Sequence, residues 1–237
     1  MGEKKLIIAI DGPAAAGKSS AGKELAKRLG YLYLDSGSLY RAMARKVLQE
    51  KIPSENQSEV ERLCHPLKVG LRLAGDKTEI WVDGINVTPS LRLPEVTHVS
   101  SIISTYPGVR KKLLSIQRGV GKEGGVVMEG RDIGTVVFPE ADVKFYLDAT
   151  IHARGERRHK EHLAKGIATD LEKTTREIEQ RDLKDSKRAI APLKKAPDAI
   201  VIDSTPLNLE EVIGRMAEEV ERKRGMGVRG RGPGPGP

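Results

Sequence analysis

The sequence predicts an α/β fold: a P-loop, doubly wound, five-stranded parallel sheet with helices on both faces, a helical lid and a small antiparallel β insert. Five short apolar runs are near-continuous rather than alternating, as in strands covered on both faces. Stretches with helical periodicity separate several of them, which gives the β-α-β-α order of a doubly wound sheet. A glycine-rich loop directly after the first run indicates a phosphate site at its end.

Each predicted strand ends at an acidic residue. The strands are LIIAI at 6–10, YLYL at 31–34, GVVM at 125–128, VKFYL at 143–147 and AIVI at 199–202, and the acids that follow are Asp11, Asp35, Glu129, Asp148 and Asp203. In open α/β sheets, ligands bind at the carboxyl ends of parallel strands, so the site is expected at this edge. We expect Asp148 and Asp203 to cap the following loop or helix rather than to bind a metal.

Three helices are predicted between or after these strands. Residues 21–30 close on Gly30, which suits a left-handed C-cap, and residues 38–51 repeat an apolar period. Residues 206–223 begin with Asn208 and Glu211 at the spacing of a capping box.

Two segments interrupt the alternation of strands and helices. Residues 67–93 contain alternating runs separated by the turns GDK and DGIN, which predicts a small antiparallel insert within residues 63–102. Residues 151–196 are dense in charge and nearly free of strand signal, which predicts a helical lid over about 151–190. One domain is therefore expected over residues 1–222, followed by a disordered basic Gly/Pro tail over 223–237.

Composition limits the possible partners. A formal net charge of +8 favours polyanions, either nucleic acid or nucleotide phosphates. The single cysteine, Cys64, and the absence of a long apolar stretch predict a cytoplasmic protein without a membrane anchor. His152, His159 and His162 share the polar lid with no cysteine, so a zinc site is not expected there.

Residues 12–19, GPAAAGKS, have the GxxxxGK[ST] pattern of a P-loop. Gly12 and Gly17 let the backbone curl so that its amides point at phosphate oxygens, and the next helix adds its positive N-terminal end. Lys18 is expected to reach the outer phosphates of ATP, and the Ser19 hydroxyl to meet Mg²⁺ carried by ATP. The predicted ATP site comprises Gly12, Pro13, Ala14, Ala15, Ala16, Gly17, Lys18, Ser19 and Ser20.

The acceptor is expected to be another phosphate. The chain contains neither the DxxG switch nor the NKxD guanine reader of a GTPase, which leaves phosphoryl transfer to a small acceptor. A phosphate acceptor is already anionic and needs arginines to hold it, rather than a general base. Such arginines follow the strand ends and fill the lid, where Arg181, Asp185 and Arg188 have the spacing of one helical face.

These motifs together resemble the bacterial cytidylate kinases, which are P-loop nucleoside monophosphate kinases. The strings that carry the resemblance are GPAAAGKSS, DSGSLYR, EGRDIGTVVFP and QRDLKDSKRAIAPL, and the likeness extends from about residue 5 to residue 222. It implies transfer of the γ-phosphoryl group of ATP to CMP or dCMP with Mg²⁺, giving CDP or dCDP and ADP. A monomer is the expectation for this architecture, and no specific nucleic acid is expected as a partner.

The resemblance also implies roles for individual residues. Arg41, Arg131 and Arg188 should hold the acceptor phosphate, and Ser101, Arg110 and Asp132 should recognise cytosine. The sugar should meet Tyr40, Arg181 and Asp185, and Ser36 should lie beside the base pocket. The implied catalytic residues are Lys18, Arg131, Arg157, Arg158 and Arg188.

At two places the roles of the family's residues do not carry over directly to this sequence. Glu129 stands where some members of the family carry aspartate, which leaves the positions of metal and water open. Among the lid arginines, Arg157 and Arg158 are preferred over Arg154 for contact with the transferring phosphoryl group.

Two other functions remain possible at this stage. One is a nucleoside monophosphate kinase with a different base preference. The other is a nucleotide-regulated nucleic-acid-binding protein that uses the basic tail, although the chain has no aromatic stacking platform to support it.

Overall fold

The computed structural model describes residues 4–75 and 77–229, and its core is a five-stranded parallel sheet with the strand order β2-β6-β1-β7-β8. β1 pairs with β6 on one side and β7 on the other, as Ile8 lies opposite both Val127 and Val143. The predicted strands are confirmed with bounds shifted by one or two residues. They are β1 Ile7–Asp11, β2 Leu32–Asp35, β6 Val126–Gly130, β7 Val143–Asp148 and β8 Ile200–Asp203.

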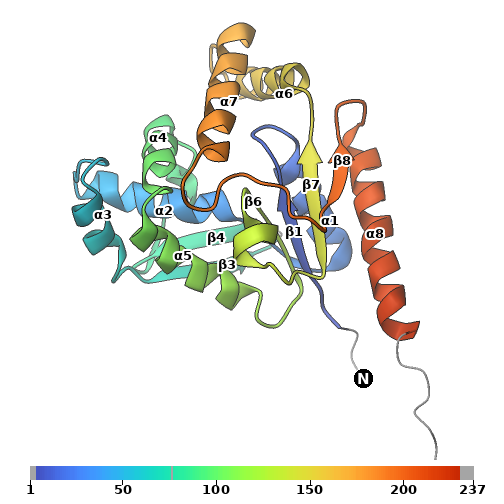
Figure 1. Cartoon of the computed structure of the whole chain (residues 1–237). Coiled ribbons are helices and arrows are strands. Elements are labelled where there is room, and N and C mark those ends of the chain that lie inside the picture. Colours follow the sequence, from blue (N-terminus) through green and yellow to red (C-terminus); the bar gives the residue numbers. More distant parts are fainter. Residues whose placement is uncertain (1–3, 76, 230–237) are drawn as a thin grey trace, which may run out of the picture.

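Helices cover both faces of the sheet, and α6 and α7 stand above the carboxyl ends of the strands (Figure 1). The helices are α1 Lys18–Leu29, α2 Ser36–Gln49, α3 Gln57–Cys64, α4 Pro94–Ile103, α5 Pro107–Val120, α6 Ile151–Ala164, α7 Leu171–Ser186 and α8 Leu209–Arg229. A π-helical turn, Ile133–Val137, follows β6. The lid predicted from charge density is therefore α6 and α7.

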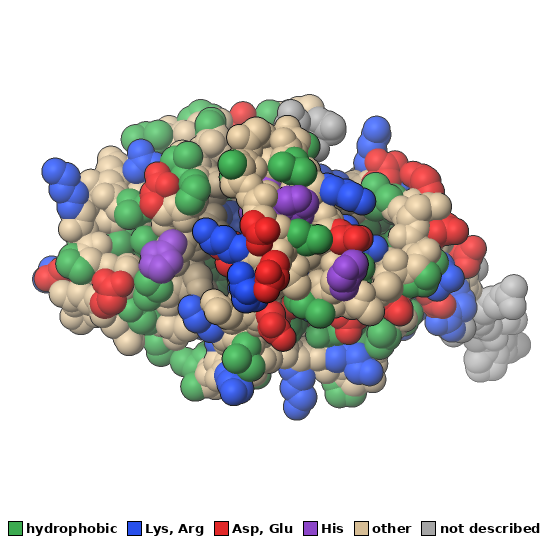
Figure 2. All heavy atoms as spheres, turned by 90° about the horizontal axis from the view of Figure 1, so that it is seen from above, with side chains coloured by type: hydrophobic (Ala, Val, Ile, Leu, Met, Phe, Trp, Pro, Cys, Tyr) green, Lys and Arg blue, Asp and Glu red, His purple; other side chains and the backbone are tan. Residues whose placement is uncertain are grey.

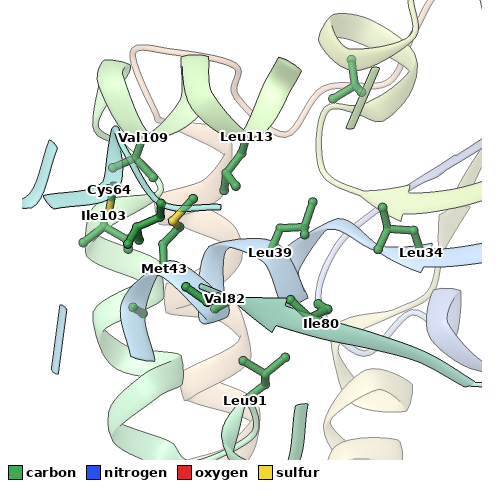
Figure 3. Packing of buried hydrophobic residues seen from close by; sticks show 14 of the residues in the cluster. Leu34, Leu39, Met43, Cys64, Ile80, Val82, Leu91, Ile103, Val109 and Leu113 are labelled. Carbon is green, nitrogen blue, oxygen red and sulfur yellow. The ribbon is translucent and has the colours of Figure 1, made fainter. Parts of the chain in front are cut away.

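Successive residues of the central strands point to opposite faces and build two hydrophobic clusters. Ile8 and Ile10 of β1 pack in the cluster that includes α1 and α8, whereas Ala9 faces the cluster of α2, α4 and α5. Figure 3 shows the second cluster, in which Cys64 lies close to Ile103 and Val109. Burial raises the pKa of the Cys64 thiol to about 12.

The predicted insert is confirmed as an antiparallel sheet in the order β3-β4-β5. Its strands are β3 Val69–Ala74, β4 Lys77–Val82 and β5 Ile85–Asn86, and the short 3₁₀ helix η1, Thr88–Ser90, leads on to α4. The Thr78 hydroxyl donates to the Tyr33 carbonyl oxygen at 2.7 Å, which attaches the insert to β2 of the main sheet.

Several predicted local features are confirmed. The capping box of α8 is present. The Asn208 N–H donates to the Glu211 carboxylate at 2.7 Å, and the Glu211 N–H donates to the Asn208 side-chain oxygen at 3.0 Å. Gly30 caps α1 with φ 65°. Asp148 and Asp203 accept backbone N–H groups of Ala149 and Thr205, as expected for capping carboxylates.

Part of the segment predicted as a disordered tail is helical. α8 continues to Arg229, so residues 223–229 are helical, and residues 230–237 of the predicted tail lie outside the described residues. Arg224 extends from the last turns of α8 to donate to the Tyr31 hydroxyl at 3.1 Å, which anchors this end on the edge of the sheet.

Candidate active site

The P-loop curls between β1 and α1 with three residues at positive φ. Gly12 has φ 147°, Ala15 has φ 59° and Gly17 has φ 93°. A Cβ on Gly12 would lie 2.0 Å from the Leu147 carbonyl oxygen, so only glycine fits beside β7. The left-handed Ala15 was not expected from the sequence, which pointed only to the glycines.

Lys18 lies buried beneath the loop, with Nζ 2.6 Å from the Pro13 carbonyl oxygen. Burial and, to a lesser extent, the positive charge of Arg131 lower the pKa of Lys18 to about 7, although Glu129 opposes the shift. The amine is therefore poised to gain a full charge when a polyphosphate enters the loop.

This pKa predicts proton uptake on nucleotide binding. At pH 8 the Lys18 amine of the free protein is mostly neutral, and bound ATP raises its pKa, so about one proton is taken up per ATP. Above pH 7 the association constant should fall by up to about tenfold per pH unit. Calorimetry with ATP in EDTA, in two buffers of different ionisation enthalpy, measures the uptake. Lys18→Arg keeps its charge and should take up none from this position, so equal uptake in both proteins would contradict the assignment.

A cavity of about 810 Å³ opens beside the P-loop. Residues 15–20 form one wall, and the lid contributes Arg157 and Arg158. The opposite wall comes from the loop after β8 and the start of α8, and Arg92 reaches in from the insert. The sequence did not predict Arg92 as part of the site, nor the wall formed by Ser204, Leu207, Asn208, Leu209 and Val212. The position of this wall directly after the end of a strand could have indicated it.

The three lid arginines differ in their surroundings. Arg157 donates to the Ser204 hydroxyl at 2.9 Å, and Arg158 donates to Glu161 at 2.8 Å on the cavity wall. Arg154 is buried, and its Nε donates to the Ala149 carbonyl oxygen at 2.9 Å. Arg157 and Arg158 therefore line the cavity, whereas Arg154 is not among its lining residues.

The three arginines predicted to hold the acceptor phosphate donate to carboxylates and to a carbonyl oxygen in the structure. Arg41 donates to Asp35 at 2.5 Å, and Arg131 Nε donates to Asp185 at 2.8 Å. Arg188 donates to the Ala191 carbonyl oxygen at 2.7 Å. Burial opposes the ionisation of Asp35, but Arg41, Ser38 and Arg92 together outweigh it, so the pKa of Asp35 falls to about 2.

Two guanidinium nitrogens of this set have no partner. The Nε atoms of Arg41 and Arg188 are buried without a hydrogen bond in the described part of the chain. A buried donor without a partner is costly, and a phosphate oxygen would satisfy it.

The prediction that Arg181, Asp185 and Arg188 share one helical face is wrong in part, because α7 ends at Ser186 and Arg188 lies beyond it. Arg181 and Asp185 remain on the helix.

Arg110 and Asp132 form a buried ion pair on the acceptor side. The Arg110 guanidinium also donates to the Ser104 carbonyl oxygen at 3.1 Å and lies 5.7 Å from the centre of the Tyr40 ring. Burial raises the pKa of Tyr40 to about 12, so its hydroxyl stays protonated. Ser101, also expected near the base, is exposed on α4.

Gly130 and Ser36 pack closely behind these residues. A Cβ on Gly130 would lie 2.5 Å from the Ser36 hydroxyl oxygen, so Gly130 allows the buried Ser36 to sit against β6. Asp11, a residue that sequence reasoning did not include in the site, accepts N–H groups of Ile133 and Gly134 at 2.8 and 2.7 Å. Burial raises its pKa to about 6. Through its two hydrogen bonds, Asp11 fixes the loop that carries Arg131 and Asp132 to the end of β1.

Glu129 lies buried at the end of β6, where it accepts a hydrogen bond from the Tyr33 hydroxyl. Burial and the charge of Asp35 raise the pKa of Glu129, whereas Lys18 and the Ser19 hydroxyl lower it. Hydroxyl and carboxylate oxygens are hard ligands that suit Mg²⁺, which usually keeps waters and nucleotide phosphates as its other ligands. No cluster of three or more His, Cys, Asp or Glu side chains suited to a metal occurs among the described residues.

Seen from above, basic and acidic side chains are interleaved across the middle of the face that carries the lid (Figure 2). The arrangement can hold two anionic groups near Lys18, with one bound to the P-loop and the other to the arginines.

Comparison with known proteins gives consistent results. Residues 8–222 match the family model described as cytidylate kinase. Over 218 residues the chain is 46% identical to the cytidylate kinase of Geobacillus sp. (strain WCH70), covering 92% of this chain and 97% of that one. Over 225 residues it is 45% identical to the cytidylate kinase of Streptococcus pneumoniae (strain 70585), covering 93% and 99%. A solved structure of an uncharacterized protein from Eubacterium ventriosum ATCC 27560 shares the fold, with a TM-score of 0.51 at 10% identity over 92% of this chain and 99% of that one.

Proposed function

The chain belongs to the cytidylate kinase family and transfers the γ-phosphoryl group of ATP to CMP or dCMP, and we propose that the residues around its P-loop divide this reaction between a donor and an acceptor half. In the transfer, an oxygen of the CMP phosphate attacks the γ-phosphorus. The bond from that phosphorus to the bridging β-oxygen breaks, and ADP leaves.

The donor half is the P-loop with Lys18. Its backbone amides and the N-terminus of α1 bind the ATP phosphates, and Lys18 balances the charge that moves to the bridging oxygen. The adenosine part of ATP occupies the cavity beside the loop, whose lid wall carries Arg157 and Arg158. These two arginines approach the transferring group when the lid closes.

The acceptor half consists of Arg41, Arg131 and Arg188. The unpartnered Nε atoms of Arg41 and Arg188 are the observation that carries this assignment, because they are buried donors that a phosphate would satisfy. When CMP binds, Arg110 and Asp132 turn from each other to the cytosine edge, where a carboxylate accepts from the amine and a guanidinium donates to the ring nitrogen and carbonyl. Tyr40, Ser36, Ser101, Arg181 and Asp185 complete the nucleoside pocket.

Ser19 and Glu129 are proposed to hold Mg²⁺ together with the ATP phosphates. When bound, the metal supplies positive charge to the β- and γ-phosphoryl oxygens. Glu129 is one methylene longer than aspartate, and the Tyr33 hydroxyl fixes its carboxylate.

The remaining expectations concern organisation and location. We propose that residues 63–102 act as the nucleotide-binding insert and residues 151–190 as the lid. No helix in the described ranges is long and apolar enough to cross a membrane. A cytoplasmic monomer remains the expectation.

The assay that tests this function measures ADP release with ATP and Mg²⁺ against CMP, dCMP, UMP, AMP and GMP. CMP and dCMP should be the preferred acceptors. UMP should react far more slowly, because its carbonyl would face Asp132 and leave buried groups unpaired. Equal turnover of UMP and CMP would overturn the role of Asp132 and Arg110, and turnover without Mg²⁺ would overturn the role of the metal.

A further inference from the structure

The peptide groups of Ala14 in the P-loop are held by two side chains of the lid. The Ala14 N–H donates to Asp182 Oδ1 at 2.9 Å, and the Ala14 carbonyl oxygen accepts from Arg154 Nη1 at 3.1 Å. Asp182 belongs to α7 and Arg154 to α6, so both lid helices contact one residue of the donor loop.

Asp182 and Arg154 also bind each other. They form an ion pair, and their side chains are only 17% and 10% exposed. Arg154 is anchored in turn by its bond to the Ala149 carbonyl oxygen at the end of β7. In a site of low exposure such a charge-assisted pair is well ordered, provided that both partners are present.

The loop needs such support because of its backbone conformation. Ala15, the next residue, has φ 59°, a left-handed conformation that is unfavourable for a residue other than glycine. Strained residues persist where their surroundings fix them. Holding Ala14 at both its N–H and its carbonyl restricts the rotation that would release Ala15.

The same turn of α7 reaches the acceptor half. Asp185 lies three residues after Asp182, on the same face of the helix, and accepts from Arg131 Nε at 2.8 Å. Asp182 therefore contacts the donor loop while Asp185 contacts an arginine of the acceptor site. One helical turn connects the two halves of the reaction.

We propose that Asp182 is a positioning residue, which together with Arg154 fixes the P-loop against the lid and so sets the donor phosphates in line with the acceptor. The inference rests on the proposed division of the site into donor and acceptor halves. Asp182 acts through the Ala14 backbone and does not touch the reacting atoms.

Its loss should change the outcome of the reaction as well as the rate. With a loosened lid, water competes with the CMP phosphate for the γ-phosphorus. Attack by water breaks the same bond to the bridging oxygen, but it gives ADP, inorganic phosphate and a proton in place of ADP and CDP. The ratio of ADP to CDP formed reports this competition. It does not depend on the fraction of folded enzyme, because unfolded protein makes neither product.

The test measures ADP and CDP together for the parent and for Asp182→Asn at saturating ATP and CMP. Because a small misplacement of reacting groups can cost up to about 10²-fold, CDP formation should fall by about tenfold to a hundredfold, and the ADP to CDP ratio should rise well above that of the parent. Glu172→Gln is the matched control, since it neutralises an exposed acid of α7 that pairs with Arg176 at the surface. It should leave both rate and ratio unchanged.

Arg154→Lys keeps the test decisive if Asp182→Asn does not fold. Lysine retains a cation beside Asp182, but its single ammonium group cannot reproduce the fork of Arg154, so the ratio should also rise. An unchanged ratio in the folded variants, with or without a slower rate, overturns the proposal. A parent enzyme that forms no CDP would instead overturn the proposed function itself.

Discussion

Lys18→Ala is expected to lower kcat for CDP formation by at least about 10³-fold, since removal of a single preorganised donor to a developing charge already costs 10²–10³-fold. Lys18 is buried under the P-loop with its amine 2.6 Å from the Pro13 carbonyl oxygen, so neither water nor a neighbouring cation can take its place easily. A steady-state assay of CDP formation, with circular dichroism to confirm folding, measures the effect.

The fold should survive this substitution. Burial holds the pKa of Lys18 at about 7 in the free protein, which means that its charged form is costly there. The melting temperature should therefore stay the same or rise. Lys27→Ala removes an exposed lysine of the same helix and should retain full activity. A loss smaller than tenfold in Lys18→Ala would contradict the role assigned to the amine.

Asp132→Asn is expected to reduce the preference for CMP over UMP, measured as a ratio of kcat/KM values, by at least about 10²-fold. The asparagine amide can donate to the uracil carbonyl, which the carboxylate repels, whereas its single carbonyl oxygen binds the cytosine amine less well. The loss for CMP should appear mainly in KM, because the base lies away from the reacting phosphate.

This variant should also be less stable. Asp132 pairs with Arg110 at 8% and 9% side-chain exposure, and removal of one partner from a buried pair costs about 3 kcal/mol or more. Urea denaturation measures that cost. Glu140→Gln, an exposed substitution in the segment after the π-helical turn, should change neither specificity nor stability. An unchanged CMP to UMP ratio in Asp132→Asn would exclude Asp132 as the residue that recognises cytosine.

The parallel sheet could be predicted from the sequence because buried strands leave a local signal. Runs such as LIIAI and GVVM are apolar on both faces, and they became β1 and β6 with bounds shifted by at most two residues. The helices α3, α4 and α5 were not assigned, because they lie in or next to the insert, where strands and helices do not alternate along the chain. The end of α8 was placed too early, because glycine-rich sequence was taken as the limit of the helix.

The parts of the site whose backbone is fixed by a local motif could be predicted from the sequence. The contacts that depend on the tertiary fold could not. The P-loop pattern predicted a phosphate-binding loop between a strand and a helix, and this order is confirmed, although α1 begins at Lys18 rather than at the predicted residue 21. Asp182 and Arg154 form hydrogen bonds with Ala14, although both are more than 130 positions from it in the chain. No motif or helical spacing predicts a contact between residues so far apart. Arg188 does not lie on the predicted helical face, because α7 ends two residues before it. The position at which a helix ends is the part of a helix that a periodic pattern predicts least well.

The burial of Cys64 makes the chain convenient for spectroscopic study of the lid. Cys64 is the only cysteine in the sequence, and its thiol is packed in the core with a pKa of about 12, so almost none of it is the thiolate that reacts with maleimides at neutral pH. A cysteine introduced at an exposed lid position such as Lys165 would then be labelled alone, without prior replacement of the native residue. A fluorophore there would report opening and closing of α6 and α7 in the otherwise unmodified enzyme.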